Sequence, residues 1–200
     1  MARIIVQQTD RIYGNLGSHQ GALLEVAAVL QDTPGSPDSE QMLEWVLHNR
    51  DYTYRESYVF MPLYDVLYNL IHRDGMPFES VGYNLNWTPN LTRIFRLLAV
   101  NGIDLLSEPR VKAFYDWPPR IICAGEFVPC IGDTGFISNR GVFEKRWGSP
   151  ERHLHDCLSA YKMTQKPEYA RILLEIGAGD KHDIFSEPLE EQLRADAENI

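Results

Sequence analysis

The segment Tyr58-Val59-Phe60-Met61-Pro62-Leu63-Tyr64-Asp65-Val66-Leu67-Tyr68-Asn69-Leu70-Ile71 carries apolar or aromatic side chains at nearly every position. Drawn as a helix, it is apolar on nearly every side, which is typical of a helix that is buried all round. Pro62 either kinks this helix or marks its true start, because proline has no backbone N–H to donate. Such a helix needs neighbours on every side. The segment therefore favours a multi-layer assembly of antiparallel helices over a four-helix bundle, whose helices each keep a polar face.

The rest of the chain predicts further helices, joined by loops rich in glycine and proline. We expect helices near residues 18–31, 38–48, 57–72, 90–101, 104–116, 150–162 and 167–176, and a short acidic helix after Ser186. Ser36 followed by Pro37 predicts the cap and the first position of the second helix. Residues 119–148 are expected to form a short irregular or β segment, so the predicted fold class is mostly α.

The composition is that of one ordinary domain, with 200 residues, an apolar fraction of 44% and a net charge of −9. We therefore expect a single helical domain over residues 1–200. The acidic balance argues against nucleic acid as a partner. No apolar run is long enough to cross a bilayer, so no membrane partner is expected. The first residues are too polar for a signal peptide. An anionic sugar remains a candidate substrate, because a few Arg or Lys side chains can make a cleft locally positive.

Cysteine and histidine spacings predict neither a disulfide framework nor a metal site. The three cysteines include no Cys-x-x-Cys pair, and the separation of Cys123 from Cys130 leaves their pairing open. His153 and His155 are two residues apart, so they point to different sides of a helix and make a poor metal pair. We expect no metal and no cofactor.

The segment Asp74-Gly75-Met76-Pro77-Phe78-Glu79-Ser80-Val81-Gly82-Tyr83-Asn84 is expected to form a loop on the helical scaffold. It places an acid, an amide and a phenol within a few residues, and loops of this kind often carry chemistry. Tyr83 could take and give a proton if its surroundings lower its pKa from about 10. The alternative is a plain connection between helices, with Phe78 and Tyr83 packed into the core.

Three motifs occur in an order that resembles a known enzyme family. They are Tyr13-Gly14-Asn15-Leu16-Gly17-Ser18-His19-Gln20, the segment from Asp74 to Asn84, and Pro129-Cys130-Ile131-Gly132-Asp133. Together they resemble the central part of the heparinase II/III-like and alginate lyase polysaccharide lyases, over about residues 13–135. The resemblance implies a partial α/α toroid, and a chain that is a fragment lacking the remaining toroid helices and the β-sandwich domain. It also implies a periplasmic or secreted location.

The chemistry of that family is β-elimination on a uronate-containing acidic polysaccharide, which is the implied substrate. By motif position, Tyr83 matches the family's catalytic tyrosine, and Asn15 matches the asparagine that neutralises the substrate carboxylate. Many members have a histidine directly after this asparagine, whereas this chain has Leu16. His19, one helical turn further on, is therefore the expected third catalytic residue. The residues expected to bind substrate are Gln20, Glu79 and Asn84.

Two other functions fit the same residues. Without the histidine and the β-sandwich, the chain would be a non-catalytic α/α-toroid domain that binds carbohydrate or acts as a scaffold. A glycoside hydrolase would instead use paired carboxylates such as Glu79 and Asp133. Asn15 is also typical of a turn, and His19 is also typical of a partly exposed residue in a first helical turn.

Overall fold

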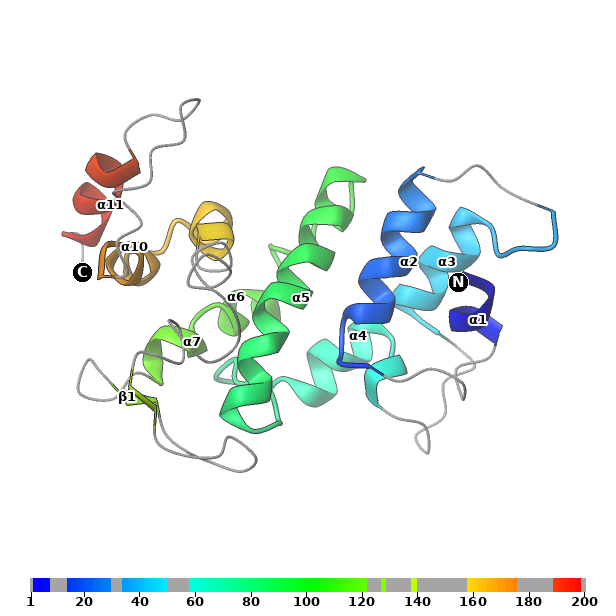
Figure 1. The fold of residues 1–200 in the computed structure, drawn as a ribbon, viewed down its shortest axis with the longest axis horizontal. Helices are drawn as coiled ribbons and strands as arrows, with labels where there is room; N and C mark the ends of the chain where they lie inside the picture. Colours follow the sequence, from blue (N-terminus) through cyan, green and yellow to red (C-terminus); the bar gives the residue numbers. More distant parts are fainter. Residues whose placement is uncertain are drawn as a thin grey trace. The chain divides into compact units, whose positions relative to one another are not determined.

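The computed structural model describes residues 2–7, 14–29, 34–49, 58–121, 127–128, 138–139, 158–175 and 189–198. Over these residues the chain is mostly α-helical, as its sequence predicts (Figure 1). Its internal contacts divide it into two compact units. Unit 1 comprises Met1–Phe78 and Asn86–Phe114, and unit 2 comprises Glu79–Leu85 and Tyr115–Ile200. A single domain over the whole chain stays a prediction.

Three helices of unit 1 lie early in the chain. They are α1 (Ala2–Gln7), α2 (Ser18–Val29) and α3 (Ser39–Leu47). Helix α2 packs against α3, and α1 contacts both of them (Figure 1). Fully buried Leu23 and Val46 lie on α2 and α3. The predicted helices near 18–31 and 38–48 are confirmed over the described residues, whereas α1 was not predicted.

Helix α3 begins with a different cap from the predicted one. Its N-cap is Asp38, whose carboxylate accepts the backbone N–H of Gln41 at 2.7 Å. The side chain of Gln41 in turn accepts the backbone N–H of Asp38 at 3.2 Å, which completes a capping box. The prediction that Ser36 caps this helix is wrong. The side chains of Asp38 and Gln41 each accept one backbone N–H of the other residue, and Gln41 stands at the spacing that this reciprocal contact requires.

The segment quoted first is not one continuous helix. It comprises a 3₁₀ turn η2 (Tyr58–Phe60), a short α4 (Leu63–Asp65) and a π-helical turn η3 (Val66–Leu70). Pro62 is the N-cap of α4, so it marks a start and does not kink a longer helix. Val59, Met61 and Leu67 are buried, but Tyr68 is 52% exposed. The expectation of a helix buried on all sides is therefore wrong.

Side-chain amides stabilise the break before Pro62. Gln20 on α2 donates from Nε2 to the carbonyl oxygens of Val59 at 2.9 Å and Met61 at 3.2 Å. Asn49, which follows α3, donates from Nδ2 to the carbonyl oxygen between them, that of Phe60, at 3.1 Å. Buried carbonyl groups without donors would be costly. These two amides thus allow the interrupted segment to lie in the core.

Helix α5 (Val81–Val100) begins well before residue 90, where the sequence predicts a helix start. Pro89 lies inside it. A proline disfavours a helix interior, which is why the sequence favours a later start. Packing outweighs this local preference, because Trp87, Leu91, Ile94 and Leu98 are all buried at helical spacing along α5.

The predicted loop after the first segment is real but shorter than expected. A turn spans residues 71–78, closed by the isolated bridge between Ile71 and Pro77 and by the 2.9 Å bond from the N–H of His72 to the carbonyl oxygen of Met76. Tyr83 and Asn84 lie in the first turn of α5 and not in the loop. Their expected loop position is therefore wrong.

Two short helices follow α5, and they replace the single helix expected near 104–116. They are α6 (Pro109–Phe114), in unit 1, and α7 (Trp117–Arg120), in unit 2. Asp104 accepts the N–H of Leu106 at 2.8 Å, which favours a turn over a helix before α6. Helix α7 includes Pro118 and Pro119, which is tolerated because the first helical positions need no backbone donor.

Unit 2 contains a helix over residues 158–164, α10 (Pro167–Glu175) and α11 (Leu189–Ala197). Helices α10 and α11 pack together, with Leu173 and Leu193 fully buried (Figure 1). The predicted helix near 167–176 and the helix after Ser186 are confirmed. Strands β1 (Phe127–Val128) and β2 (Ser138–Asn139) pair antiparallel within the segment 119–148. The residues named above that lie outside the described part are Tyr13, Cys123, Pro129, Cys130, Ile131, Gly132, Asp133, His153, His155 and Ser186.

Candidate functional site

The first predicted site residue, Asn15, lies in an exposed turn that leads into α2. Its carbonyl oxygen accepts the N–H of Ser18 at 3.1 Å. Gly17 has a φ of +86°, and a Cβ there would lie 2.8 Å from Cβ of Asn90 on α5. Asn90 also donates from Nδ2 to the carbonyl oxygen of Leu16 at 2.8 Å. Two hydrogen bonds thus hold this turn, one within it and one from Asn90 to the carbonyl oxygen of Leu16. The Asn15 side chain is exposed.

Leu16, which stands where many members of the resembled family have a histidine, is a core residue here. Its side chain is 2% exposed. A charged or proton-transferring side chain would be unfavourable at such a position, because burial without partners penalises polar groups. The backbone that places Asn15 on the surface therefore turns the next side chain inward.

His19 lies in the first turn of α2, and its ring is half-buried. It stacks on Phe60 with ring centroids 5.4 Å apart and an interplanar angle of 19°. Its Nε2 atom is buried, and no hydrogen-bond partner for it exists among the residues that the structure describes. A Cβ added to Gly14 would lie 3.1 Å from this atom, so the ring packs this closely only because residue 14 has no side chain. Burial lowers the pKa of the His19 imidazole below its ordinary value.

Gln20, a predicted substrate-binding residue, has a structural role. Its side chain is 1% exposed. Its Nε2 donates to the carbonyl oxygens of Val59 and Met61, as described above. Its Oε1 accepts the N–H of Gly17 at 3.1 Å. One amide thus connects the turn around Asn15 to η2. Binding of substrate by Gln20 stays a prediction.

The other predicted residues gather at the beginning of α5. Tyr83 is half-buried in its first turn. Asn84 is fully buried, and its Nδ2 donates to the carbonyl oxygen of Glu79 at 2.9 Å. This bond ties the loop before the helix to its first turn. Glu79 itself is half-buried.

The six predicted residues fall into two groups. Asn15, His19 and Gln20 lie in unit 1, within one turn and the start of α2. Glu79, Tyr83 and Asn84 lie in unit 2. The structure brings together the members of each group, and the sequence-based expectation that Asn15, His19 and Tyr83 share one concave surface stays a prediction.

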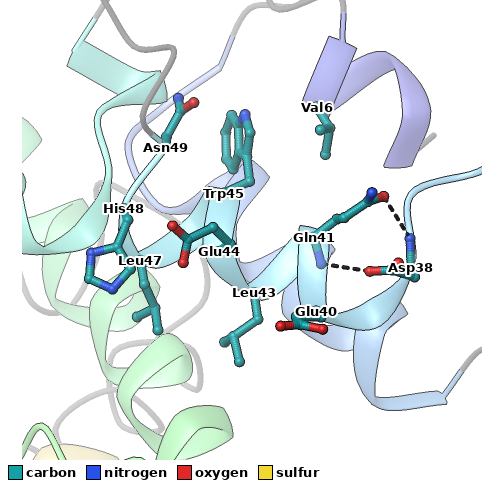
Figure 2. Close-up of a pocket in the computed structure, with 10 residues that line it drawn as sticks. All are labelled: Val6, Asp38, Glu40, Gln41, Leu43, Glu44, Trp45, Leu47, His48 and Asn49. Carbon is teal, nitrogen blue, oxygen red and sulfur yellow. Dashed lines mark hydrogen bonds between the residues drawn. The ribbon is translucent and has the colours of Figure 1, made fainter.

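A groove of about 850 Å³ in unit 1 was not foreseen from the sequence. It follows α3 and reaches Val6 on α1 (Figure 2). Glu40, Glu44 and His48, which all line it, are spaced by four residues and therefore share one face of the helix. That spacing was visible in the sequence. The hollow beside it was not, because it depends on how α1 packs against α3.

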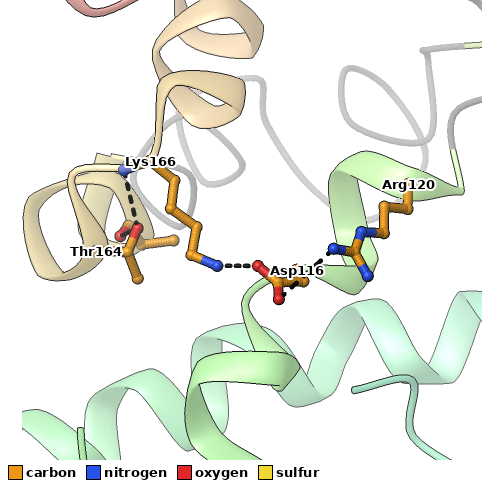
Figure 3. Close-up of polar contacts among 5 residues, drawn as sticks. Asp116, Arg120, Thr164 and Lys166 are labelled. Atoms are coloured by element: carbon orange, nitrogen blue, oxygen red, sulfur yellow. Dashed lines mark hydrogen bonds and ion pairs between the residues drawn. The ribbon is translucent and has the colours of Figure 1, made fainter. Parts of the chain in front are cut away.

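Polar side-chain contacts in unit 2 join its elements to one another. Asp116 forms an ion pair with Lys166, and Nη2 of Arg120 lies 3.8 Å from the Asp116 carboxylate (Figure 3). Burial lowers the pKa of the Lys166 ammonium. Near α11, the hydroxyl of Tyr161 donates to Asp196, and burial together with this hydrogen bond raises the pKa of the tyrosine. The first pair connects the start of α7 to the residue before α10, and the second connects the helix at 158–164 to α11.

Within the described part of the chain, no helix has the length and hydropathy that a membrane span requires. The comparisons with known proteins give no family for this chain. Protein-family models, curated proteins and solved structures were compared with it, and none of the three comparisons finds a match.

Proposed function

We propose that this chain is a polysaccharide lyase-like domain, part of an α/α toroid, that acts by β-elimination on a uronate-containing acidic glycan. The observation that carries the proposal is the environment of His19. A half-buried imidazole with a lowered pKa stays neutral at neutral pH, and a neutral imidazole can accept a proton. Its buried Nε2 packs against Gly14, whose lack of a side chain allows this close approach, and exposed Asn15 is in the same turn.

In this mechanism His19 removes the proton from the ring carbon next to the substrate carboxylate. The electron pair of that C–H bond forms the new double bond, and the glycosidic oxygen leaves from the neighbouring carbon. The Asn15 amide donates a hydrogen bond to the carboxylate while negative charge builds up on it. Tyr83 then protonates the leaving oxygen, which requires that it reach the same sugar ring.

The experiment is incubation of the chain with a panel of uronate glycans, measuring the ultraviolet absorbance of the unsaturated product. His19→Gln, Asn15→Ala and Tyr83→Phe should each reduce turnover on the order of a hundredfold or more, because each removes a group that acts on the reacting atoms. His72→Gln is the matched control, since His72 is exposed and lies in another turn. Full activity of His19→Gln, or no unsaturated product from any glycan, would contradict the proposal.

A second candidate is a non-catalytic carbohydrate-binding or scaffold domain. It is favoured because several residues of the resembled motifs are buried and have their polar groups hydrogen-bonded within the protein. Leu16 is buried, and the amides of Gln20 and Asn84 bond to backbone carbonyl groups. This candidate predicts saturable binding of a glycan without any unsaturated product. The same panel, followed by calorimetry, separates the two functions.

A further inference from the structure

The pair Asn101-Gly102 is the only Asn-Gly step in the sequence, and it lies directly after α5. Asparagine is among the chemically labile residues. A following glycine makes it more so, because a residue without a side chain lets its backbone nitrogen approach the asparagine amide. Both residues of this pair are exposed. Whether the pair reacts in the folded protein depends on how the end of α5 holds it.

A Schellman motif ends α5 at this pair. Gly102 has a φ of +83°, and its N–H donates to the carbonyl oxygen of Ala99 at 3.1 Å. The N–H of Ile103 donates to the carbonyl oxygen of Leu98 at 2.9 Å. These are the two hydrogen bonds of that motif. The backbone nitrogen of Gly102 is therefore occupied while the last turn stays closed.

Little besides these bonds holds the helix end closed. Nδ2 of Asn101 donates to the carbonyl oxygen of Leu97 at 2.7 Å, in an exposed position. Val100 is 87% exposed, and a Cβ added to Gly102 would meet no atom within 4 Å. Local opening is least costly at exposed helix ends that fray. The last turn can thus open while the core around the rest of α5 stays packed.

The only Asp-Gly step in the sequence, Asp74-Gly75, can react in the same way but is enclosed. Gly75 is buried, and a Cβ there would lie 1.8 Å from the carbonyl oxygen of Ala113. Oδ1 of Asp74 accepts the N–H of Met76 at 3.1 Å. Opening this turn would separate it from α6, which makes local opening more costly here. The structure therefore distinguishes the two pairs.

We propose that Asn101 deamidates spontaneously through fraying of the last turn of α5, without unfolding of unit 1. The backbone nitrogen of Gly102 forms a bond to Cγ of Asn101, and the bond between Cγ and Nδ2 breaks. Nδ2 leaves as ammonia, which takes up the proton of the Gly102 N–H, and a cyclic imide remains. Water then opens the imide to aspartate, or to isoaspartate, in which the main chain continues through Cγ.

The product holds the end of α5 less well than the asparagine does. A carboxylate at residue 101 has no N–H to donate to the carbonyl oxygen of Leu97. Its negative charge also lies at the helix C-terminus, where the helix dipole disfavours an anion. Isoaspartate adds an atom to the main chain and so changes the spacing of the Schellman bonds. We therefore expect faster amide hydrogen exchange at residues 102 and 103 after the reaction.

The test is incubation of the whole chain at mildly alkaline pH, followed by peptide mass mapping. Isoaspartate is detected by methyl transfer from S-adenosylmethionine with an isoaspartate-specific methyltransferase. Asn101 should react before every other asparagine, and Asp74 should remain unlabelled. Asn101→Gln should abolish the label at this position, because a glutamine would have to form a larger ring. Absence of isoaspartate at residue 101, or earlier reaction of another asparagine, would refute the proposal.

A destabilised variant separates local fraying from global unfolding. Asp38→Ala removes the cap of a different helix, α3, and should increase the unfolded fraction about fivefold. The deamidation rate at Asn101 should stay at the parental value, because the end of α5 is unchanged. A low urea concentration that increases the unfolded fraction by the same factor provides a second measurement. A rate that rises in proportion to the unfolded fraction would show that the reaction requires unfolding, and it would overturn the proposal.

Discussion

Gly75 occupies a position in unit 1 where a side chain would collide with the backbone of another element. A Cβ there would lie 1.8 Å from the carbonyl oxygen of Ala113 on α6. Its φ of +92° is also a conformation that side chains disfavour. The turn over residues 71–78 can therefore approach α6 this closely only because residue 75 has no side chain.

Gly75→Ala should lower the free energy of unfolding by roughly 2 to 5 kcal/mol, which combines the strained φ with overpacking against a backbone that cannot move away. Chemical denaturation measures this change. Gly102→Ala is the matched control, because Gly102 has a similar φ of +83° but nothing within 4 Å of its added Cβ. The control should cost only about 1 to 2 kcal/mol. Equal losses for both variants would mean that the close approach to α6 does not matter.

Buried amides show how single residues can serve the fold where sequence motifs indicate a ligand. Gln20 follows His19 in a motif that resembles an enzyme site, yet its amide bonds to Gly17, Val59 and Met61. Because polar side chains at functional sites and in structural networks are of the same types, residue identity alone does not separate the two roles. The two roles are separated only by the hydrogen-bond partners of the side chain, which for Gln20 are backbone groups of the same chain.

At the scale of elements, α3 combines a strong start with an unfavourable end. The capping box of Asp38 and Gln41 satisfies its first backbone donors. Glu44 then places a negative charge in its last turn. The helix is kept in place by burial of Met42, Trp45 and Val46. Burial of these side chains thus keeps α3 in place although a negative charge in its last turn is unfavourable for the helix by itself.

Asp38→Ala should lower the free energy of unfolding by about 1 kcal/mol, because it leaves the backbone N–H of Gln41 without its side-chain acceptor. Ser36→Ala should change it by less than about 0.5 kcal/mol, since exposed Ser36 lies outside the capping box. Urea denaturation of the two variants compares the observed cap with the one predicted from sequence. A larger loss for Ser36→Ala would contradict the observed cap.

Helix α5 illustrates why element boundaries are harder to predict than element types. Its apolar positions after residue 90 have a clear helical period, and that part is confirmed. Its first residues lie before Pro89 and contain Gly82, both of which locally disfavour a helix. Burial of Val81 and Trp87 outweighs these preferences. This burial depends on residues distant in the sequence.

At the scale of the whole molecule, the pH dependence of stability depends on every group whose pKa changes on folding. Of the described groups with a displaced pKa, only His19 has an ordinary pKa near neutrality, 6.5. Burial lowers the His19 pKa in the folded protein, so the unfolded chain takes up this proton first as the pH falls. The free energy of unfolding should therefore decrease as the pH falls from about 7.5 to 5.5, above the range in which most carboxylates titrate.

His19→Gln should make this decrease smaller, because it removes the buried group that resists protonation. His72→Gln, which removes an exposed histidine, should leave the pH dependence closer to that of the parent chain. Thermal or urea denaturation at several pH values measures both. A parental pH dependence in His19→Gln would show that burial of this imidazole does not contribute, and it would weaken the case for His19 as a neutral base.

The sequence by itself determined the mostly helical class and the helices at α2, α3, α10 and the second half of α5, because apolar periodicity is a local property of the chain. Whether Tyr58–Ile71 forms one continuous helix or an interrupted segment depended on tertiary structure. Its carbonyl groups found donors on Gln20 and Asn49, more than ten residues away, so an interruption at Pro62 became stable. The groove along α3 depended on it too, since a hollow exists only between packed elements. The four-residue spacing of Glu40, Glu44 and His48 was visible in the sequence, but the hollow that they line came only with the packing of α1 against α3.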